Sequence, residues 1–265
     1  GTVLAGVLAS APVRAALVTI CLAALGYLAG RQVPPAPPAA ERIPFDRHII
    51  RASISLVNAT MHIPRLFLAI CSISFFWTIG AVLIIIFPPL VKNVLGANEQ
   101  VASLFIAIFS IGIAIGSVLI NRLLKSEVSA RYAPASVIAM GCFVVLLHFV
   151  SLTWDKQNDG LITLANFIFQ PMAGLMILAL LGVAITGGMF VVPLYAFLTT
   201  TVPKTETART VAANNIVNSG AMVIGSLLAF ALSSVGIGPV GQLLLVAAMC
   251  LVSAWLGWKL HLACD

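Results

Sequence analysis

Residues 66–87 read LFLAICSISFFWTIGAVLIIIF, a stretch without one charged side chain. The hydrocarbon core of a bilayer is about 30 Å thick, and a helix that rises about 1.5 Å per residue needs about 20 apolar residues to cross it. Pro88 and Pro89 follow directly and mark the end of the run. The stretch therefore predicts a membrane-spanning helix.

Apolar runs of similar length recur along the chain. Residues 15–30 form one before the linker, and residues 1–10 look like the end of an earlier span. The run 161–169 is too short to cross a bilayer, so we place it at the interface or as a lead-in to the span that follows. We expect an all-α, polytopic membrane helix bundle. Its six spans after residue 65 are 66–87, 101–120, 133–152, 174–198, 211–232 and 241–260.

The composition excludes a soluble domain. Of the 265 residues, 61% are hydrophobic and 8% are charged, whereas soluble domains carry about 25% charged residues. Such a chain has too little polar surface to cover itself in water. The formal net charge of +6 comes from basic residues at the ends of the apolar runs. No stretch alternates basic and aromatic residues, so we expect no nucleic-acid partner.

The composition changes sharply between residues 31 and 65. This segment holds four prolines within residues 34–38 and several arginines, as expected of a linker stiffened at its start. Because the chain opens without Met inside an apolar run, we expect it to be a fragment of a longer protein. The predicted parts are 1–30, the end of one helical half; 31–65, a linker; 66–260, a six-helix half; and 261–265, a tail.

A short amphipathic helix is predicted inside the linker, over residues 43–57. Arg47 and Arg51 fall on other faces than the apolar residues. Two interpretations stay open: the helix lies on the cytoplasmic leaflet with its arginines near anionic lipid, or it packs against cytoplasmic loops. The apolar residues at helical spacing are Phe45, Ile49, Ile50, Ile54 and Val57.

The basic residues predict the orientation of the spans. Of the 14 Lys and Arg residues, eleven fall on one side, in the linker, the 121–132 loop, the 200–210 loop and the C-terminal end. The opposite side holds Arg14, Lys92 and Lys156. By the positive-inside rule, the linker and the C-terminus are cytoplasmic.

The motifs of the common enzyme and metal sites are missing. All eight acidic residues lie outside the apolar runs or at their ends, so this part offers neither a buried carboxylate for proton relay nor a carboxylate pair for acid–base catalysis. The cysteines form no C-x-x-C pair, and no G-x-S-x-G, H-E-x-x-H or phosphate-loop pattern occurs. We expect this chain not to be an enzyme, with no metal and no cofactor.

A few polar groups at membrane depth are candidate substrate-binding residues. Asn214 and Asn218 share a helix face, and Asn215 lies on the adjoining stripe. An amide facing lipid is costly, so these residues either meet a substrate headgroup or gate the cytoplasmic mouth, or they hydrogen-bond between helices. Tyr195 is either a further hydroxyl at the site or an interface anchor. Trp77 is the aromatic candidate.

Small residues predict close packing or bending. Gly112 and Gly116 form a G-x-x-x-G pattern, which close helix packing explains without any function. Gly187, Gly188 and Pro193 soften the helix that contains them, as in the broken helices that line transporter cavities, although such residues also occur in ordinary spans.

Several segments resemble the second half of a major facilitator superfamily transporter. The resemblance covers almost the whole chain, and it is strongest to the lysophospholipid-transporter branch, above all its fusions with glycerophospholipid acyltransferase and acyl-carrier-protein synthetase. The sequence departs from that branch at Thr199 and Ile86, where glutamines are usual. The segments that carry the resemblance are FFW (75–77), LGANE (95–99), FSIGIAIGS (109–117), GMFVVPLYA (188–196) and ARTVAANNIVN (208–218).

The resemblance implies a multi-pass protein of the bacterial inner membrane that moves lysophospholipid between leaflets for reacylation. Its partners would be membrane lipid, an N-terminal transporter half and a fused or associated acyltransferase. Two other functions stay open: another facilitator-type carrier, such as a drug exporter, or a membrane anchor for fused lipid-metabolising enzymes.

The predicted orientation can be tested by labelling a single cysteine. In a variant whose native cysteines are replaced, Ser126→Cys should react with an impermeant maleimide only when the cytoplasmic side is exposed, because residue 126 lies in a basic loop. Labelling only from the periplasm would overturn the orientation.

A second prediction follows from the resemblance. A transporter of this kind builds its site between two repeats, and residues 66–260 would supply only one of them. We predict that this chain alone transports nothing. Uptake of labelled lysophosphatidylethanolamine by vesicles that contain this chain, with neither an N-terminal half nor an oligomer that forms one, would contradict the half-transporter interpretation.

Overall fold

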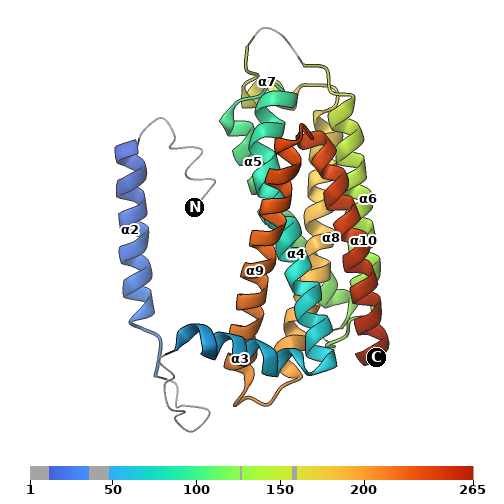
Figure 1. Ribbon diagram of the computed structural model, residues 1–265. Helices are drawn as coiled ribbons and strands as arrows, with labels where there is room; N and C mark the ends of the chain where they lie inside the picture. Colours follow the sequence, from blue (N-terminus) through green and yellow to red (C-terminus); the bar gives the residue numbers. More distant parts are fainter. Residues whose placement is uncertain (1–11, 36–47, 126, 157–159, 265) are drawn as a thin grey trace. The chain divides into compact units, whose positions relative to one another are not determined.

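The computed structural model of the chain describes residues 12–35, 48–125, 127–156 and 160–264. Seven of the described helices are long and apolar enough to cross a membrane, which confirms the predicted all-α polytopic bundle. A π-helical turn, η1 (Leu90–Val94), follows directly after the helix that ends at Pro89. Two shorter helices are α3 (Ile49–Met61) and α7 (Leu164–Ile168). The long helices are α2 (Pro12–Gly30), α4 (Pro64–Pro89), α5 (Glu99–Leu123), α6 (Ala133–Leu152), α8 (Ala173–Thr200), α9 (Thr207–Ser234) and α10 (Pro239–Cys264) (Figure 1).

The chain divides into two compact units, Gly1–Pro44 and Phe45–Asp265. The first contains α2. The second contains all the later helices, and α3 packs within it against α9 and α4. The division falls inside the predicted linker, residues 31–65.

Helix ends differ from the predicted bounds in ways that the local sequence explains. Helix α6 has the predicted bounds, whereas α10 continues to Cys264, so most of the predicted tail is helical. The linker helix begins at Ile49 and runs to Met61, four residues beyond the predicted end; residues 43–47 lie outside the described residues. It stops there because Ile63 precedes Pro64 and adopts an extended conformation, as residues before proline prefer.

The six long helices of the second unit form two triplets, α4–α5–α6 and α8–α9–α10, with α7 between them in sequence. The first helix of each triplet packs against the second helix of the other: α4 against α9, and α8 against α5. The first helix of each also packs against the third of the other, and the two third helices pack together. Exchanging the triplets reproduces the same pairings. Because each triplet has three spans, the second runs in the opposite direction to the first (Figure 1).

Glycines bring α5 and α8 into backbone contact. A side chain at Gly112 would meet Ala184, and one at Gly116 would meet the carbonyl of Ile185. From the other helix, a Cβ at Gly188 would lie 2.6 Å from the carbonyl oxygen of Ile113. These glycines let the two backbones approach as small residues do in membrane helix pairs.

Helix α8 is continuous, so the broken helix considered for Gly187, Gly188 and Pro193 does not occur. Gly187 faces Phe76 of α4 and Met140 of α6, and Pro193 is buried within the helix. The two glycines lie in close contact with neighbouring helices, within one continuous helix.

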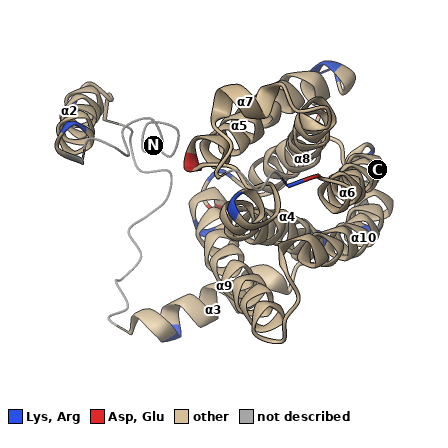
Figure 2. Ribbon diagram, turned by 90° about the horizontal axis from the view of Figure 1, so that it is seen from above, with Lys and Arg blue, Asp and Glu red and all other residues tan. Residues whose placement is uncertain are grey.

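Charged residues of the second unit lie at the ends of the helices. Among its described residues, every Lys, Arg, Asp and Glu lies in a connection or within two turns of a helix end (Figure 2). A charge in the middle of a span is costly in lipid. The walls of the bundle are therefore apolar, as a membrane requires.

The glycine contact between α5 and α8 can be tested with a matched pair of substitutions. Gly116→Ala adds a methyl group against the Ile185 carbonyl, so the helices must separate; overpacking of this kind costs about 1–3 kcal/mol. We expect a lower melting temperature in detergent than for the unsubstituted protein.

The control is Gly80→Ala in α4, where an added Cβ has nothing within 4 Å. This variant should melt at the same temperature or slightly higher, because alanine is the better helix former. Equal melting temperatures for the two variants would show that the α5–α8 contact is not tight.

Candidate functional site

A hydrogen-bonded network joins α4, α8 and α9. Ser74 Oγ donates to Asn218 Oδ1 over 2.7 Å. Asn218 Nδ2 donates to Tyr195 Oη over 3.4 Å, and Trp77 Nε1 donates to the same oxygen over 2.7 Å. Three of the predicted substrate-binding residues, Trp77, Tyr195 and Asn218, therefore lie together, each on a different helix.

Tyr195 is the acceptor at the centre of this network. A tyrosine hydroxyl has two acceptor positions and one proton to donate. Trp77 and Asn218 occupy both acceptor positions, so the hydroxyl proton is left to donate to a further acceptor. The side chain of Tyr195 is half-buried and that of Trp77 is 41% exposed, so the network reaches the surface of the unit.

Asn214 lies one helical turn before Asn218 on the buried face of α9. Its side chain is fully buried, and its Oδ1 has no hydrogen-bond partner. Its Nδ2 donates to Asn215 Oδ1 at 3.5 Å, the outer limit of a hydrogen bond. Leaving a buried acceptor unpaired costs about 1–3 kcal/mol, so a donor that reaches Asn214 would be bound favourably.

Asn215 lies on an exposed part of α9, beside the buried face that holds Asn214 and Asn218. The adjoining Ser219 is also exposed and donates to the Asn215 carbonyl oxygen. The two predicted stripes are therefore one buried and one exposed, and only Asn218 joins the network with Tyr195.

The predicted gating and packing residues lie apart from this network. Gly112, Gly116 and Gly188 belong to the α5–α8 contact. Pro193 is two residues before Tyr195 and is buried. Gly187 lies against Phe76, the residue before Trp77.

An apolar groove of about 350 Å³ adjoins the network between α4 and α9. This volume is near the lower end of the roughly 300–1,000 Å³ typical of ligand sites. Ser74 belongs to both the network and the groove. The lining of the groove is almost entirely apolar, and Ser74 joins it to the polar network through its bond to Asn218. Its lining residues are Cys71, Ser74, Phe75, Thr78, Val217, Ala221, Ile224, Gly225, Leu228 and Met249.

Sequence reasoning missed Ser74 and the groove. Ser74 and Thr78 are four residues apart in an otherwise apolar run, and Thr78 Oγ1 donates to the Ser74 carbonyl oxygen over 2.7 Å. Their spacing was a signal that one face of α4 is more polar than the others. The partner of that face could not be found from spacing, because Asn218 is 144 residues away. Gly225 lies against Thr78, where a side chain would clash.

Acidic and metal-binding side chains do not gather near the network. Within the part of the chain that the structure describes, no three His, Cys, Asp or Glu residues come together as metal ligands would. The groups available to a ligand here are a hydroxyl, amides, an indole and apolar side chains.

Comparison of the chain with models of known protein families, with curated proteins and with solved structures finds no match. The functional interpretation therefore rests on the helix pairing and on the geometry around Tyr195 and Asn218.

Proposed function

We propose that this chain is the C-terminal half of a major-facilitator-type transporter that moves lysophospholipid across the bacterial inner membrane for reacylation. The observation that carries the proposal is the exchangeable pairing of the two helix triplets, α4–α5–α6 and α8–α9–α10. Nested three-helix repeats of opposite direction are the building plan of each half of such transporters. A helix bundle that serves only as an anchor has no need of this symmetry.

The substrate class is supported by the network and the groove beside it. Tyr195 has a proton to donate, and Asn218 Nδ2 has a second hydrogen beyond the one given to Tyr195. Both suit the oxygen acceptors of a phosphate ester. The groove suits an acyl chain, because its lining is almost entirely apolar. One polar network beside one apolar groove matches a lipid with a single chain.

The length and direction of the groove suit a lipid of the cytoplasmic leaflet. Its residues on α9 run from Val217 to Leu228, about 16 Å at about 1.5 Å per residue. Half of a bilayer's hydrocarbon core is about 15 Å thick. With the orientation predicted by the basic residues, the Asn218 end faces the cytoplasm and the Leu228 end faces the middle of the membrane. A lipid in this leaflet has the same direction.

Flux of labelled lysophosphatidylethanolamine in the complete transporter separates the proposal from its alternatives. A lipid transporter moves this substrate between leaflets. A drug exporter leaves it in place and moves cationic dyes, and an anchor for lipid enzymes moves neither. Absence of lysophospholipid flux in a folded, complete protein would reject the proposal.

The network generates a sharper prediction. Asn218→Leu removes both the bond from Ser74 and the bond to Tyr195, and Asn214→Leu removes the neighbouring buried amide. Each should reduce lipid flux per folded molecule by roughly two- to tenfold, since one hydrogen bond contributes about 0.5–1.5 kcal/mol. Membrane insertion should persist, because leucine inserts more readily than asparagine, and the stability cost is about 0.6 kcal/mol per bond.

Gln242→Leu is the matched control. Gln242 is also a buried amide, and its Nε2 donates to Ser233 Oγ and to the Ile237 carbonyl oxygen at the other end of the bundle. This variant should lose folded yield by a similar amount and keep its flux per folded molecule. Normal flux per folded molecule in the Asn214 and Asn218 variants would give these residues a packing role only.

A further inference from the structure

Helix α3 carries three different faces. One face holds Leu56 and Thr60 and packs against α9 and α4; Thr60 is only 8% exposed. A second face holds Ile50 and Ile54, which are 78% and 65% exposed. The third is polar and begins at Arg51. A helix that only bridged two protein surfaces would have no reason to expose large isoleucines on one edge.

The packed face fixes α3 to the end of the bundle. A hollow of about 260 Å³ lies between α3 and the start of α9, lined on one side by Leu56, Ala59 and Thr60 and on the other by Glu206 and Arg209. Helix α4 begins at Pro64, three residues after α3 ends at Met61. Helix α3 therefore lies at the level where α4 enters the membrane, and it crosses the direction of the long helices (Figure 1).

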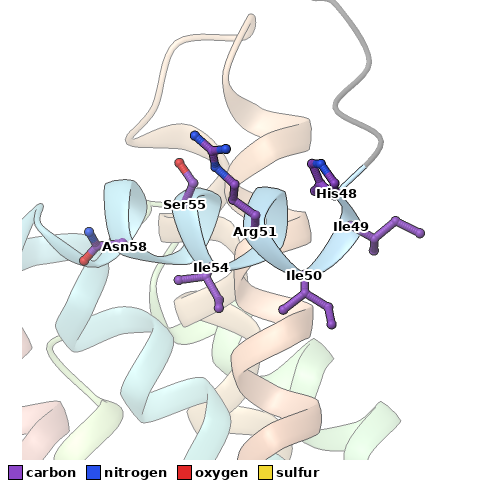
Figure 3. Close-up of a pocket in the computed structure, with 7 residues that line it drawn as sticks. All are labelled: His48, Ile49, Ile50, Arg51, Ile54, Ser55 and Asn58. Atoms are coloured by element: carbon purple, nitrogen blue, oxygen red, sulfur yellow. The ribbon is translucent and has the colours of Figure 1, made fainter.

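The exposed isoleucines and the polar side chains leave opposite edges of α3. Figure 3 shows Ile50 and Ile54 pointing toward the side on which the long helices continue, and Arg51 and Ser55 pointing the other way. The seven residues drawn there all belong to α3 or directly precede it, so they surround one helix and do not enclose a ligand. Their apolar and polar edges are separated along the axis of the bundle.

That separation identifies what covers the isoleucines. The walls of the long helices are apolar and must lie in hydrocarbon, so the polarity around the protein changes along the same axis. Isoleucines directed toward the hydrocarbon and an arginine directed away from it match this change. A second protein surface would impose no such direction.

The charge of the helix identifies the lipid. Arg51 is exposed on the polar edge, Arg65 and Arg209 are exposed at the same end of the bundle, and Glu206 lies beside Arg209. Basic residues at a membrane surface are attracted to anionic headgroups. An interfacial helix typically combines such a basic face with an apolar one.

We infer that α3 is an interfacial helix that binds anionic phospholipid, with Ile50 and Ile54 in the acyl region and Arg51 at the headgroup phosphates. This surface is separate from the groove between α4 and α9, and it does not depend on what the protein transports. Both interpretations of the linker helix then hold, each for a different face of α3. One face packs on the protein, and another lies in the leaflet.

Spin labels on neighbouring residues test the position of the helix. Ile54→Cys and Ser55→Cys, each in the full chain without its native cysteines, are labelled with a nitroxide in vesicles of phosphatidylethanolamine and phosphatidylglycerol. The label at 54 should collide more with oxygen, which concentrates in hydrocarbon, and the label at 55 more with a water-soluble nickel chelate. A label at 54 that meets the chelate as often as the label at 55 would overturn the inference. So would a label at 54 that meets neither reagent, because protein would then cover it.

The role of charge has its own variant and control. When phosphatidylglycerol replaces phosphatidylcholine in the vesicles, the ratio of oxygen to nickel collisions at position 54 should rise. Arg51→Gln should remove most of that rise, whereas Asn58→Gln, which changes the same polar edge without changing its charge, should keep it. An unchanged rise in Arg51→Gln would reject the recognition of anionic lipid by this residue.

Discussion

The close approach of α5 and α8 is the contact on which the arrangement of the bundle depends. Between helices in lipid there is little hydrophobic driving force, so packing at short range must hold them together. Gly112 and Gly116 remove side chains where α5 meets Ala184 and the Ile185 backbone, and Gly188 does the same where α8 meets Ile113. Each triplet contributes one helix to this contact, so it joins the two halves of the exchangeable pairing.

When the two triplets are exchanged, the pair α5–α8 corresponds to the pair α4–α9. The contacts between α4 and α9 are of a different kind. Gly225 gives α9 one close approach, to Thr78, but the pair also carries the Ser74–Asn218 hydrogen bond and the apolar groove. The two equivalent helix pairs therefore differ. Glycines pack α5 closely against α8, whereas α4 and α9 leave a groove beside a polar hydrogen bond. The proposed lipid site lies in the pair that is not closely packed by several glycines.

The sequence predicted the spans well and their partners poorly. Hydropathy identifies where a helix lies in the membrane, which is why the bounds of α6 agree with the prediction. It says little about where the helix stops in water, so α9 and α10 extend beyond their apolar runs. Asn214 and Asn218 share one buried helix face, as predicted, whereas Asn215 is exposed. Trp77 and Tyr195 form their bond across 118 residues, a separation that no local pattern contains. The loop around Gly96 also pairs with Ile162, whose amide donates to the Gly96 carbonyl oxygen. The sequence of neither loop predicts this pairing.

Helix α3 connects the surface of the membrane to the pair of helices that holds the network. It packs against the start of α9 and leads directly into α4. Those two helices are joined by the bond between Ser74 and Asn218, which lies within a few turns of the same end of the bundle. Movement of α4 relative to α9 would strain this hydrogen bond and would also displace α3, which contacts both helices. A helix held in the leaflet by Ile50 and Ile54 resists displacement out of the leaflet, since that would draw apolar side chains into water. The lipid that surrounds α3 and the polar network inside the bundle therefore constrain the same relative movement of α4 and α9.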